Sequence, residues 1–290
     1  ALFREMEMRK VADVLARHGI NTLLLKGNAL GQWLYPEPYL RVTCDIDLLF
    51  ESRAVAEQAA VAFGEIGYEP GFSPAASNYE MTSRLVVDGV SRSELDLHCR
   101  LLNAPAYADI FAFEELCVAS LPLTGFGDGL RALCSKHALA HACLNRALDM
   151  QTGFPDQLKL LYDIHLLVGR MDADAWQQFL TMVREKRITG ICLRSITDTV
   201  AAFNSPIPVH AMQALHRQAA DEPIDWLRLD DWRYMQLQNL KSLQGPWAKL
   251  KWIWDKVFPT RSHLQELHGD GGWMQLMGRR LVRGVQRLRG

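Results

Sequence analysis

The sequence Leu23-Leu-Leu-Lys-Gly27, followed by Arg41-Val-Thr-Cys-Asp-Ile-Asp-Leu-Leu49, decides the predicted fold of this chain. The three leucines indicate a short buried strand that ends at a Lys-Gly corner. The apolar residues around the two aspartates indicate a second buried strand. Residues two apart in a strand point to the same face of a sheet. We therefore expect Asp45 and Asp47 to project together, while their apolar neighbours point the other way.

A third acidic segment, Ser93-Glu-Leu-Asp-Leu-His98, has the same character. Asp96 lies between two leucines, as an acid does on the open face of an otherwise buried strand. Adjacent acids repel each other, and a divalent metal ion between them removes that repulsion. Asp45, Asp47 and Asp96 are therefore predicted to be the catalytic metal ligands of a two-metal phosphoryl-transfer centre. The alternative is three surface acids on short edge strands, and Glu94 replaces Asp96 if the strand register is shifted.

Together these motifs resemble the signature of the polymerase-β-like nucleotidyltransferase superfamily. That signature is a glycine corner, an Asp-hydrophobic-Asp strand and a later hydrophobic-Asp-hydrophobic strand. The local motifs Leu-Lys-Gly, Arg-x-x-x-Asp-Ile-Asp-Leu-Leu and Leu-Asp-Leu-His are similar to its uncharacterised bacterial branch. The resemblance continues into Leu133-Cys-Ser-Lys-His-Ala-Leu-Ala-His141 and Lys159-Leu-Leu-Tyr-Asp163 and extends to Phe258-Pro259, so it covers most of the chain. It implies Mg²⁺ or Mn²⁺ as cofactor and a nucleoside triphosphate (NTP) as substrate.

The glycine corner departs from the superfamily pattern, because it is Lys26-Gly27-Asn28 rather than Gly-Ser or Gly-Gly. The segment between the corner and the acidic strand is also longer than usual. Glycine lets the backbone come close to a phosphate, and the start of a helix offers free N–H donors. Lys26, Gly27 and Asn28 are therefore predicted to bind the triphosphate, with Lys26 as a point charge. A turn with a solvated lysine is the alternative.

Three further residues are predicted to contact the substrate. Arg41 is expected to bind a phosphate oxygen or to hold the carboxylates bidentately, unless it is an ordinary loop arginine. His98 shares the face of Asp96 in a regular strand, where it contacts substrate or metal or is a structural histidine. The resemblance implies that Lys159 lines the cleft, although an i, i+4 ion pair with Asp163 is the simpler interpretation.

Other patterns favour structural roles. His137 and His141 have a spacing that suits zinc, but no third ligand is evident, so a polar helix face that meets the cleft is the favoured functional interpretation. The tryptophans from Trp226 to Trp254 are spaced for helix packing, with a base-stacking platform as the alternative. Five arginines and no acid follow Gly272. They favour a docked amphipathic helix over one that binds an anionic membrane or RNA.

Composition sets bounds on the function. The chain has 290 residues and is 49% hydrophobic, which suffices for two domains. The net charge of −1 argues against a broad nucleic-acid-binding surface, although a local basic strip leaves a nucleic-acid acceptor open. Six scattered cysteines without a C-x-x-C pair, and an N-terminus unlike a secretory signal, favour the cytoplasm. No apolar run reaches the roughly 18 residues of a spanning helix.

The predicted fold class is a small mixed-sheet α/β module followed by an all-α region. The α/β module has predicted helices at 2–18, 28–34 and 53–66 and strands at 22–25, 46–50, 80–88 and 91–98, the last two joined at an Asp-Gly turn. The helical region has predicted helices at 130–148, 154–168, 173–186, 190–203, 209–220, 231–243 and 247–257. We place a nucleotidyltransferase-like domain at 1–110 and a helical, acceptor-binding domain at 111–290.

The predicted function is a metal-dependent nucleotidyltransferase. It moves a nucleoside monophosphate from an NTP to a hydroxyl or phosphate of an unidentified small-molecule or peptide acceptor. A phosphotransferase that moves the γ-phosphoryl group is the first alternative, and it releases a nucleoside diphosphate instead of pyrophosphate. A non-catalytic nucleotide-binding protein is the second, and the presence of all three acids counts against it. An RNA-modifying toxin–antitoxin role is the third.

Overall fold

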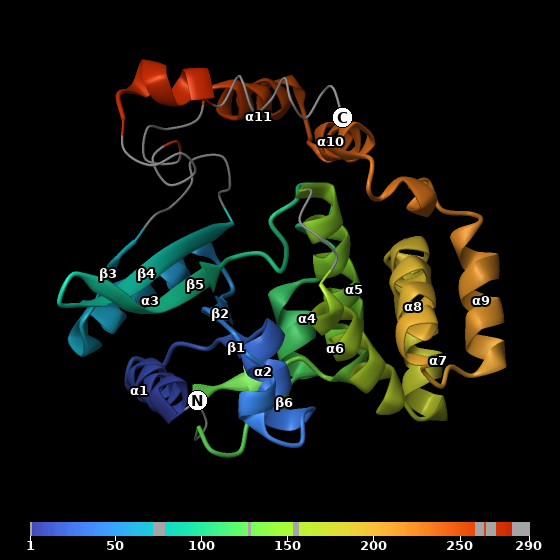
Figure 1. Cartoon of the computed structure of the whole chain (residues 1–290), viewed down its shortest axis with the longest axis horizontal. Coiled ribbons are helices and arrows are strands. Elements are labelled where there is room, and N and C mark those ends of the chain that lie inside the picture. Colours follow the sequence, from blue (N-terminus) through green and yellow to red (C-terminus); the bar gives the residue numbers. More distant parts are fainter. Residues whose placement is uncertain are drawn as a thin grey trace.

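The structure, a computed structural model, describes residues 2–71, 79–126, 129–152, 157–258, 264 and 271–279. A mixed sheet with helices on one side is followed by a bundle of helices on the other, which confirms the predicted fold class (Figure 1). The strands are β1 (Leu23–Leu24), β2 (Ile46–Leu49), β3 (Tyr68–Pro70), β4 (Glu80–Val87), β5 (Val90–His98), β6 (Leu121–Pro122) and β7 (Arg131–Ala132). The sheet order is β3-β4-β5-β2-β1-β7-β6.

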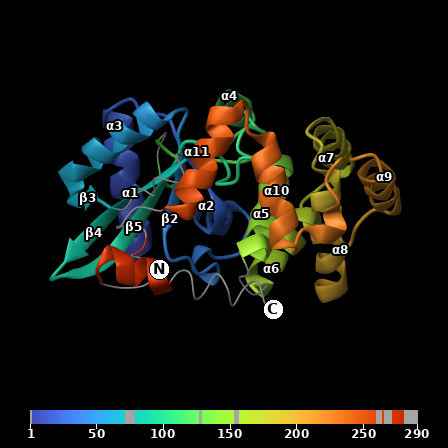
Figure 2. The same cartoon turned by 90° about the horizontal axis from the view of Figure 1, so that it is seen from above.

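Helices flank and follow this sheet. In the α/β part they are α1 (Leu2–Arg17), α2 (Lys26–Trp33), η1 (Pro38–Leu40), α3 (Arg53–Phe63), η2 (Gly64–Ile66) and α4 (Phe113–Val118). In the helical part they are α5 (Ser135–Thr152), α6 (Leu158–Gly169), α7 (Ala173–Glu185), α8 (Thr189–Phe203), α9 (Val209–Ala219), η4 (Trp226–Arg228), α10 (Trp232–Ser242) and α11 (Pro246–Val257). Seen from above, α1 and α3 lie beside the sheet, and α2 lies between the sheet and the helices α5 to α9 (Figure 2).

The alternation of side chains along the central strands divides the apolar residues into two cores. Leu24 and Leu48 belong to the core under α1 and α3, as do Leu95 and Leu97 of β5. Leu23, Leu25 and Leu49 belong to the other core, which continues into helices α5 to α10. Residues at the remaining positions of β2 and β5 therefore face the helical bundle. The acids of these strands therefore project toward the bundle, on the face opposite their apolar neighbours.

Several elements differ from the predicted ones. Helix α2 begins at Lys26, two residues earlier than predicted, and the helix predicted at 53–66 ends at Phe63 and continues as the 3-10 turn η2. Strands β3, β6 and β7 and helix α4 were not predicted, because two to six residues carry too little periodicity. Strands β6 and β7 extend the sheet past residue 110, so helix α5 begins at Ser135 rather than at 130. The division into two domains stays a prediction.

Two tryptophans near the C-terminus are more exposed than predicted. Trp247 and Trp254 of α11 are 80% and 60% exposed, so their predicted packing is wrong for these two side chains. Most of the arginine-rich segment, from residue 280 onward, lies outside the described residues, so its predicted helix stays a prediction. Among the described residues, no helix combines the length and the apolar character that a membrane span requires.

Candidate active site

Two of the predicted metal ligands meet across neighbouring strands. Strand β2 pairs with β5 in parallel, and this register aligns Asp47 with Asp96. His98, two residues further along β5, points to the same face, as predicted for a regular strand. One ligand atom from each of these three residues lies within 4.8 Å of the other two, a separation that a metal ion can bridge. In the described residues, the structure thus forms an Asp-Asp-His group.

Asp45 and Glu94 lie outside the Asp-Asp-His group. Asp45 precedes β2 and lines the adjoining cavity, and its negative charge still acts on Asp96. It is not a member of the Asp-Asp-His group, so its role as a metal ligand stays a prediction. Glu94 is paired with Arg84 at 2.8 Å, which removes it as a substitute for Asp96.

Asp96 lies buried among other acids. Burial raises its pKa to about 9, and the negative charges of Glu80, Asp47 and Asp45 add to the effect. Its buried Oδ1 atom has no hydrogen-bond partner. A divalent ion would satisfy this oxygen and offset the repulsion, so the residues present fit a metal site. The sequence does not single out Glu80, because only the pairing of β4 with β5 places it opposite His98.

Lys26 supplies the positive charge nearest to this group. Its Nζ lies 2.5 Å from Asp47 Oδ1, and His98 Nε2 lies 3.0 Å from the same oxygen. Burial alone would raise the pKa of Asp47, but Lys26 and His98 outweigh burial and hold this pKa well below its usual range. The Lys26 backbone has a φ of 50°, a left-handed conformation that costs a non-glycine residue roughly 1–2 kcal/mol. The protein therefore accepts strain at the residue that neutralises Asp47.

The Gly27-Asn28 corner is shaped by packing within the protein. A Cβ atom on Gly27 would lie 2.6 Å from the Thr43 side chain and 2.8 Å from that of Arg41, so only glycine fits. The Asn28 side-chain amide donates to the Asp45 carbonyl and accepts from the Thr43 hydroxyl. The first intrahelical bond of α2 runs from Ala29 N–H to the Leu25 carbonyl, at 3.3 Å, so the N–H groups of residues 26–28 precede it. Phosphate binding by these N–H groups stays a prediction.

Arg41 and Asp163 form a buried ion pair, which corrects two predictions. Arg41 Nη2 lies 2.7 Å from Asp163 Oδ2, so Arg41 binds Asp163 rather than the predicted metal-binding carboxylates. Asp163 accepts bonds from Arg41 Nε and Nη2 and from the Tyr35 hydroxyl, so the predicted Lys159–Asp163 pair is wrong. The physical reason is geometric, because a planar guanidinium fits a carboxylate bidentately. This pair joins the segment before β2 to helix α6, and the use of Arg41 for phosphate stays a prediction.

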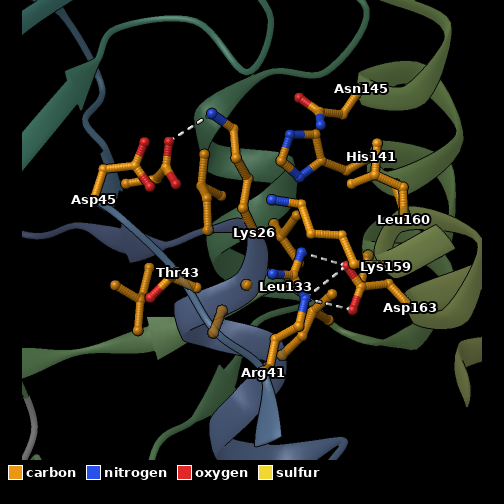
Figure 3. A pocket seen from close by; sticks show the side chains of 18 of the residues that line it. Lys26, Arg41, Thr43, Asp45, Leu133, His141, Asn145, Lys159, Leu160 and Asp163 are labelled. Carbon is orange, nitrogen blue, oxygen red and sulfur yellow. Dashed lines mark hydrogen bonds and ion pairs between the residues drawn. The ribbon is translucent and has the colours of Figure 1, made fainter. Parts of the chain in front are cut away.

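A cavity of about 280 Å³ separates the sheet from the bundle. Lys26 and Asp45 line it from the sheet side, and His141, Asn145 and Lys159 line it from α5 and α6 (Figure 3). Among the described residues, no acid forms an ion pair with Lys159, which lines this cavity. The structure shows Lys159 in the cleft, as predicted. Nucleotide binding by Lys159 stays a prediction.

The two histidines of α5 have separate environments. His141 lines the cavity, and burial lowers its pKa to about 3. His137 contacts Cys134, with 3.3 Å between Nδ1 and Sγ, and lies 3.8 Å from Glu115. Within the described part of the chain, neither histidine joins a group of three metal ligands. The structure thus gives no support to the zinc alternative and supports a polar face at the cleft for His141 alone.

Comparison with known protein families gives a match. The family model described as "Uncharacterised nucleotidyltransferase" matches residues 3–203. Among solved structures, the chain is similar to an antigenic nucleotidyltransferase-like protein from Paracoccidioides brasiliensis, at 16% identity and a TM-score of 0.41, over 72% of this chain and 95% of that one. No curated protein matches the chain. The family match covers well over half of the residues, and the chain therefore belongs to the family of uncharacterised nucleotidyltransferases.

Proposed function

We propose that this protein is a divalent-metal-dependent nucleotidyltransferase. It would move a nucleoside monophosphate from an NTP to a hydroxyl or phosphate of a small-molecule or peptide acceptor. The observation that carries the proposal is the alignment of Asp47 with Asp96 across parallel strands, with an unsatisfied carboxylate oxygen on Asp96. Membership of the nucleotidyltransferase family supports nucleotidyl transfer in general. The six free cysteines agree with a reducing, cytoplasmic location.

Asp47 and Asp96, with Asp45 beside them, would hold Mg²⁺ or Mn²⁺, because both ions bind carboxylate oxygens. The bound ion would neutralise charge on the triphosphate and lower the proton affinity of the attacking hydroxyl. In the metal-free protein, His98 and Lys26 both contact the same oxygen of Asp47 and hold this carboxylate in place.

The chain's own cations and N–H groups would position the substrate. Lys159 and the start of α2 line the cavity next to Asp47, where they can donate to phosphate oxygens. The acceptor oxygen would attack the α-phosphorus, and the bond to the bridging oxygen would break so that pyrophosphate leaves. The proton of the acceptor hydroxyl would pass to solvent or to a carboxylate of the site. Lys159, opposite Lys26 across the cavity, would hold the triphosphate in line for this displacement.

The products distinguish the proposal from its rivals. The protein is incubated with Mn²⁺ or Mg²⁺, a metabolite extract and an NTP labelled in either the α- or the γ-phosphate, and the products are identified by mass spectrometry. Nucleotidyl transfer places the α-label on an acceptor and releases pyrophosphate. Transfer of the γ-label with release of a nucleoside diphosphate would support the phosphotransferase. Binding without any transfer would support the non-catalytic protein.

Asp47→Asn is the matched variant for this assay. The asparagine keeps the shape of the side chain but loses the charge that holds a metal. The substitution removes the ion pair with Lys26 as well as the repulsion on Asp96, so the melting temperature should fall by several degrees while the protein stays folded, and transfer should fall roughly a thousandfold or more. Circular dichroism is the control for folding. Near-normal turnover by a folded Asp47→Asn variant would contradict the proposed site.

A further inference from the structure

We infer that His98 is a nitrogen ligand of the metal centre, that Glu80 holds its imidazole in place, and that the centre therefore prefers a first-row transition ion such as Mn²⁺ over Mg²⁺. The inference rests on the proposed function only in so far as that function places a metal at Asp47 and Asp96.

His98 is aimed at the acid pair. Only 2% of its surface is exposed, and its Nε2 atom lies 3.0 Å from Asp47 Oδ1. It stands two residues after Asp96 on the same face of β5, so both side chains project toward the helical bundle. A ligand atom of His98 falls within the 4.8 Å that encloses those of Asp47 and Asp96. The imidazole thus lies where a third donor to the same ion would be.

The second ring nitrogen has a carboxylate beside it. His98 Nδ1 has no hydrogen-bond partner, and Glu80 Oε2 lies 3.7 Å from it. Glu80 is the cross-strand partner of His98 on β4, and the Asn103 amide donates to the same oxygen of Glu80. Histidines that bind metals through one nitrogen usually donate the other N–H to a carboxylate, which fixes the tautomer. His98 has this arrangement, with Glu80 beside Nδ1 and Asp47 beside Nε2.

This donor set has consequences for the choice of metal. Mg²⁺ strongly favours oxygen ligands and keeps several waters, whereas imidazole nitrogen suits first-row transition ions. Two carboxylates with one imidazole would therefore bind Mn²⁺ more tightly than Mg²⁺. The competing interpretation is that His98 only donates a hydrogen bond to Asp47 and positions it. In that case, the ion would have oxygen ligands alone.

Pulsed electron paramagnetic resonance of the Mn²⁺-loaded protein distinguishes these cases without any assay of activity. A directly bound imidazole produces nitrogen modulation of the Mn²⁺ signal, and uniform ¹⁵N labelling of histidine changes the frequency of this modulation. The unaltered chain should show both effects, so the test does not depend on the folding of a variant. Mn²⁺ that binds without nitrogen modulation would overturn the inference.

Variants assign the nitrogen to one residue. His98→Gln should lose the modulation. His165→Gln should keep it, because His165, on α6, is bonded to Ser205 and is in none of the ligand groups found among the described residues. Glu80→Gln should keep the modulation and weaken Mn²⁺ binding about 10- to 100-fold. Modulation that persists in His98→Gln would contradict the assignment. If Mn²⁺ binds in an Asp47-dependent way but without nitrogen, only this inference fails; if Mn²⁺ does not bind at all, the proposed site fails as well.

Discussion

Lys26→Met tests whether Lys26 stands in for a metal ion in the metal-free protein. Methionine keeps the length of the side chain, and it has the same backbone cost at a φ of 50° as any other residue with an unbranched side chain. The substitution removes the ammonium group that lies 2.5 Å from Asp47, a carboxylate with 3% side-chain exposure. Breaking a buried pair costs roughly 3–5 kcal/mol. The Lys26 side chain is 31% exposed and His98 still contacts Asp47, so we expect about 2–3 kcal/mol.

Lys26→Met should strengthen the binding of metal and weaken the binding of nucleotide. Without metal, the melting temperature should fall by roughly 4–10 °C. Mn²⁺ should bind on the order of 10–100-fold more tightly than to the parent, because a competing cation is gone. A nonhydrolysable NTP should bind more weakly, because a phosphate contact is lost. Calorimetric titration with Mn²⁺ alone and then with the nucleotide separates the two effects. Unchanged or weaker Mn²⁺ binding would refute the reasoning, and unchanged nucleotide binding would show that the corner is only a turn.

Three further substitutions test other parts of the site. Asp163→Asn leaves Arg41 buried without its partner, so urea unfolding should show a loss of roughly 3–5 kcal/mol, against less than about 1 kcal/mol for the exposed control Glu57→Gln; equal losses would contradict a structural ion pair. Lys159→Met should raise the dissociation constant of an NTP about tenfold and leave Mn²⁺ binding unchanged; unchanged NTP binding would place the triphosphate elsewhere. Burial lowers the pKa of His141 to about 3, so the unfolded chain binds a proton more readily than the folded one. The free energy of unfolding should therefore decrease as the pH drops below about 6.5, by on the order of 3 kcal/mol at pH 4.5. His141→Gln should remove this part of the pH dependence, and an unaltered profile would show that His141 is not its source.

The faces of the strands could be predicted from the sequence because strand periodicity is local. Alternation of leucines with acids placed Asp47, Asp96 and His98 on one face, and the structure shows them there. The helices of the bundle were also predicted near their observed bounds, since each has enough residues for the helical period to be visible. Ser52 caps α3 by accepting the N–H of Val55.

What could not be predicted depends on contacts distant in sequence. Arg41 and Asp163 are separated by 122 residues, and no local pattern indicates that they form an ion pair. Glu80 reaches His98 only through the register of β4 with β5. The left-handed backbone of Lys26 runs against the preference of a lysine, and this residue pairs with Asp47 and begins α2. Each of these features follows from tertiary packing, which overrides the local preference of the residue.

The most direct test of the central claim is the affinity of Mn²⁺ for the parent and for Asp47→Asn, each titrated with and without a nonhydrolysable NTP. Because a triphosphate supplies ligands that the ion otherwise takes from water, metal and nucleotide should bind cooperatively at one site. In the parent, we predict that the nucleotide tightens Mn²⁺ binding at least about tenfold, a coupling of about 1.4 kcal/mol. In Asp47→Asn, we predict weak Mn²⁺ binding and no coupling. Equal Mn²⁺ affinity in the two proteins, or coupling that survives the substitution, would contradict a metal–nucleotide site on this face of the sheet.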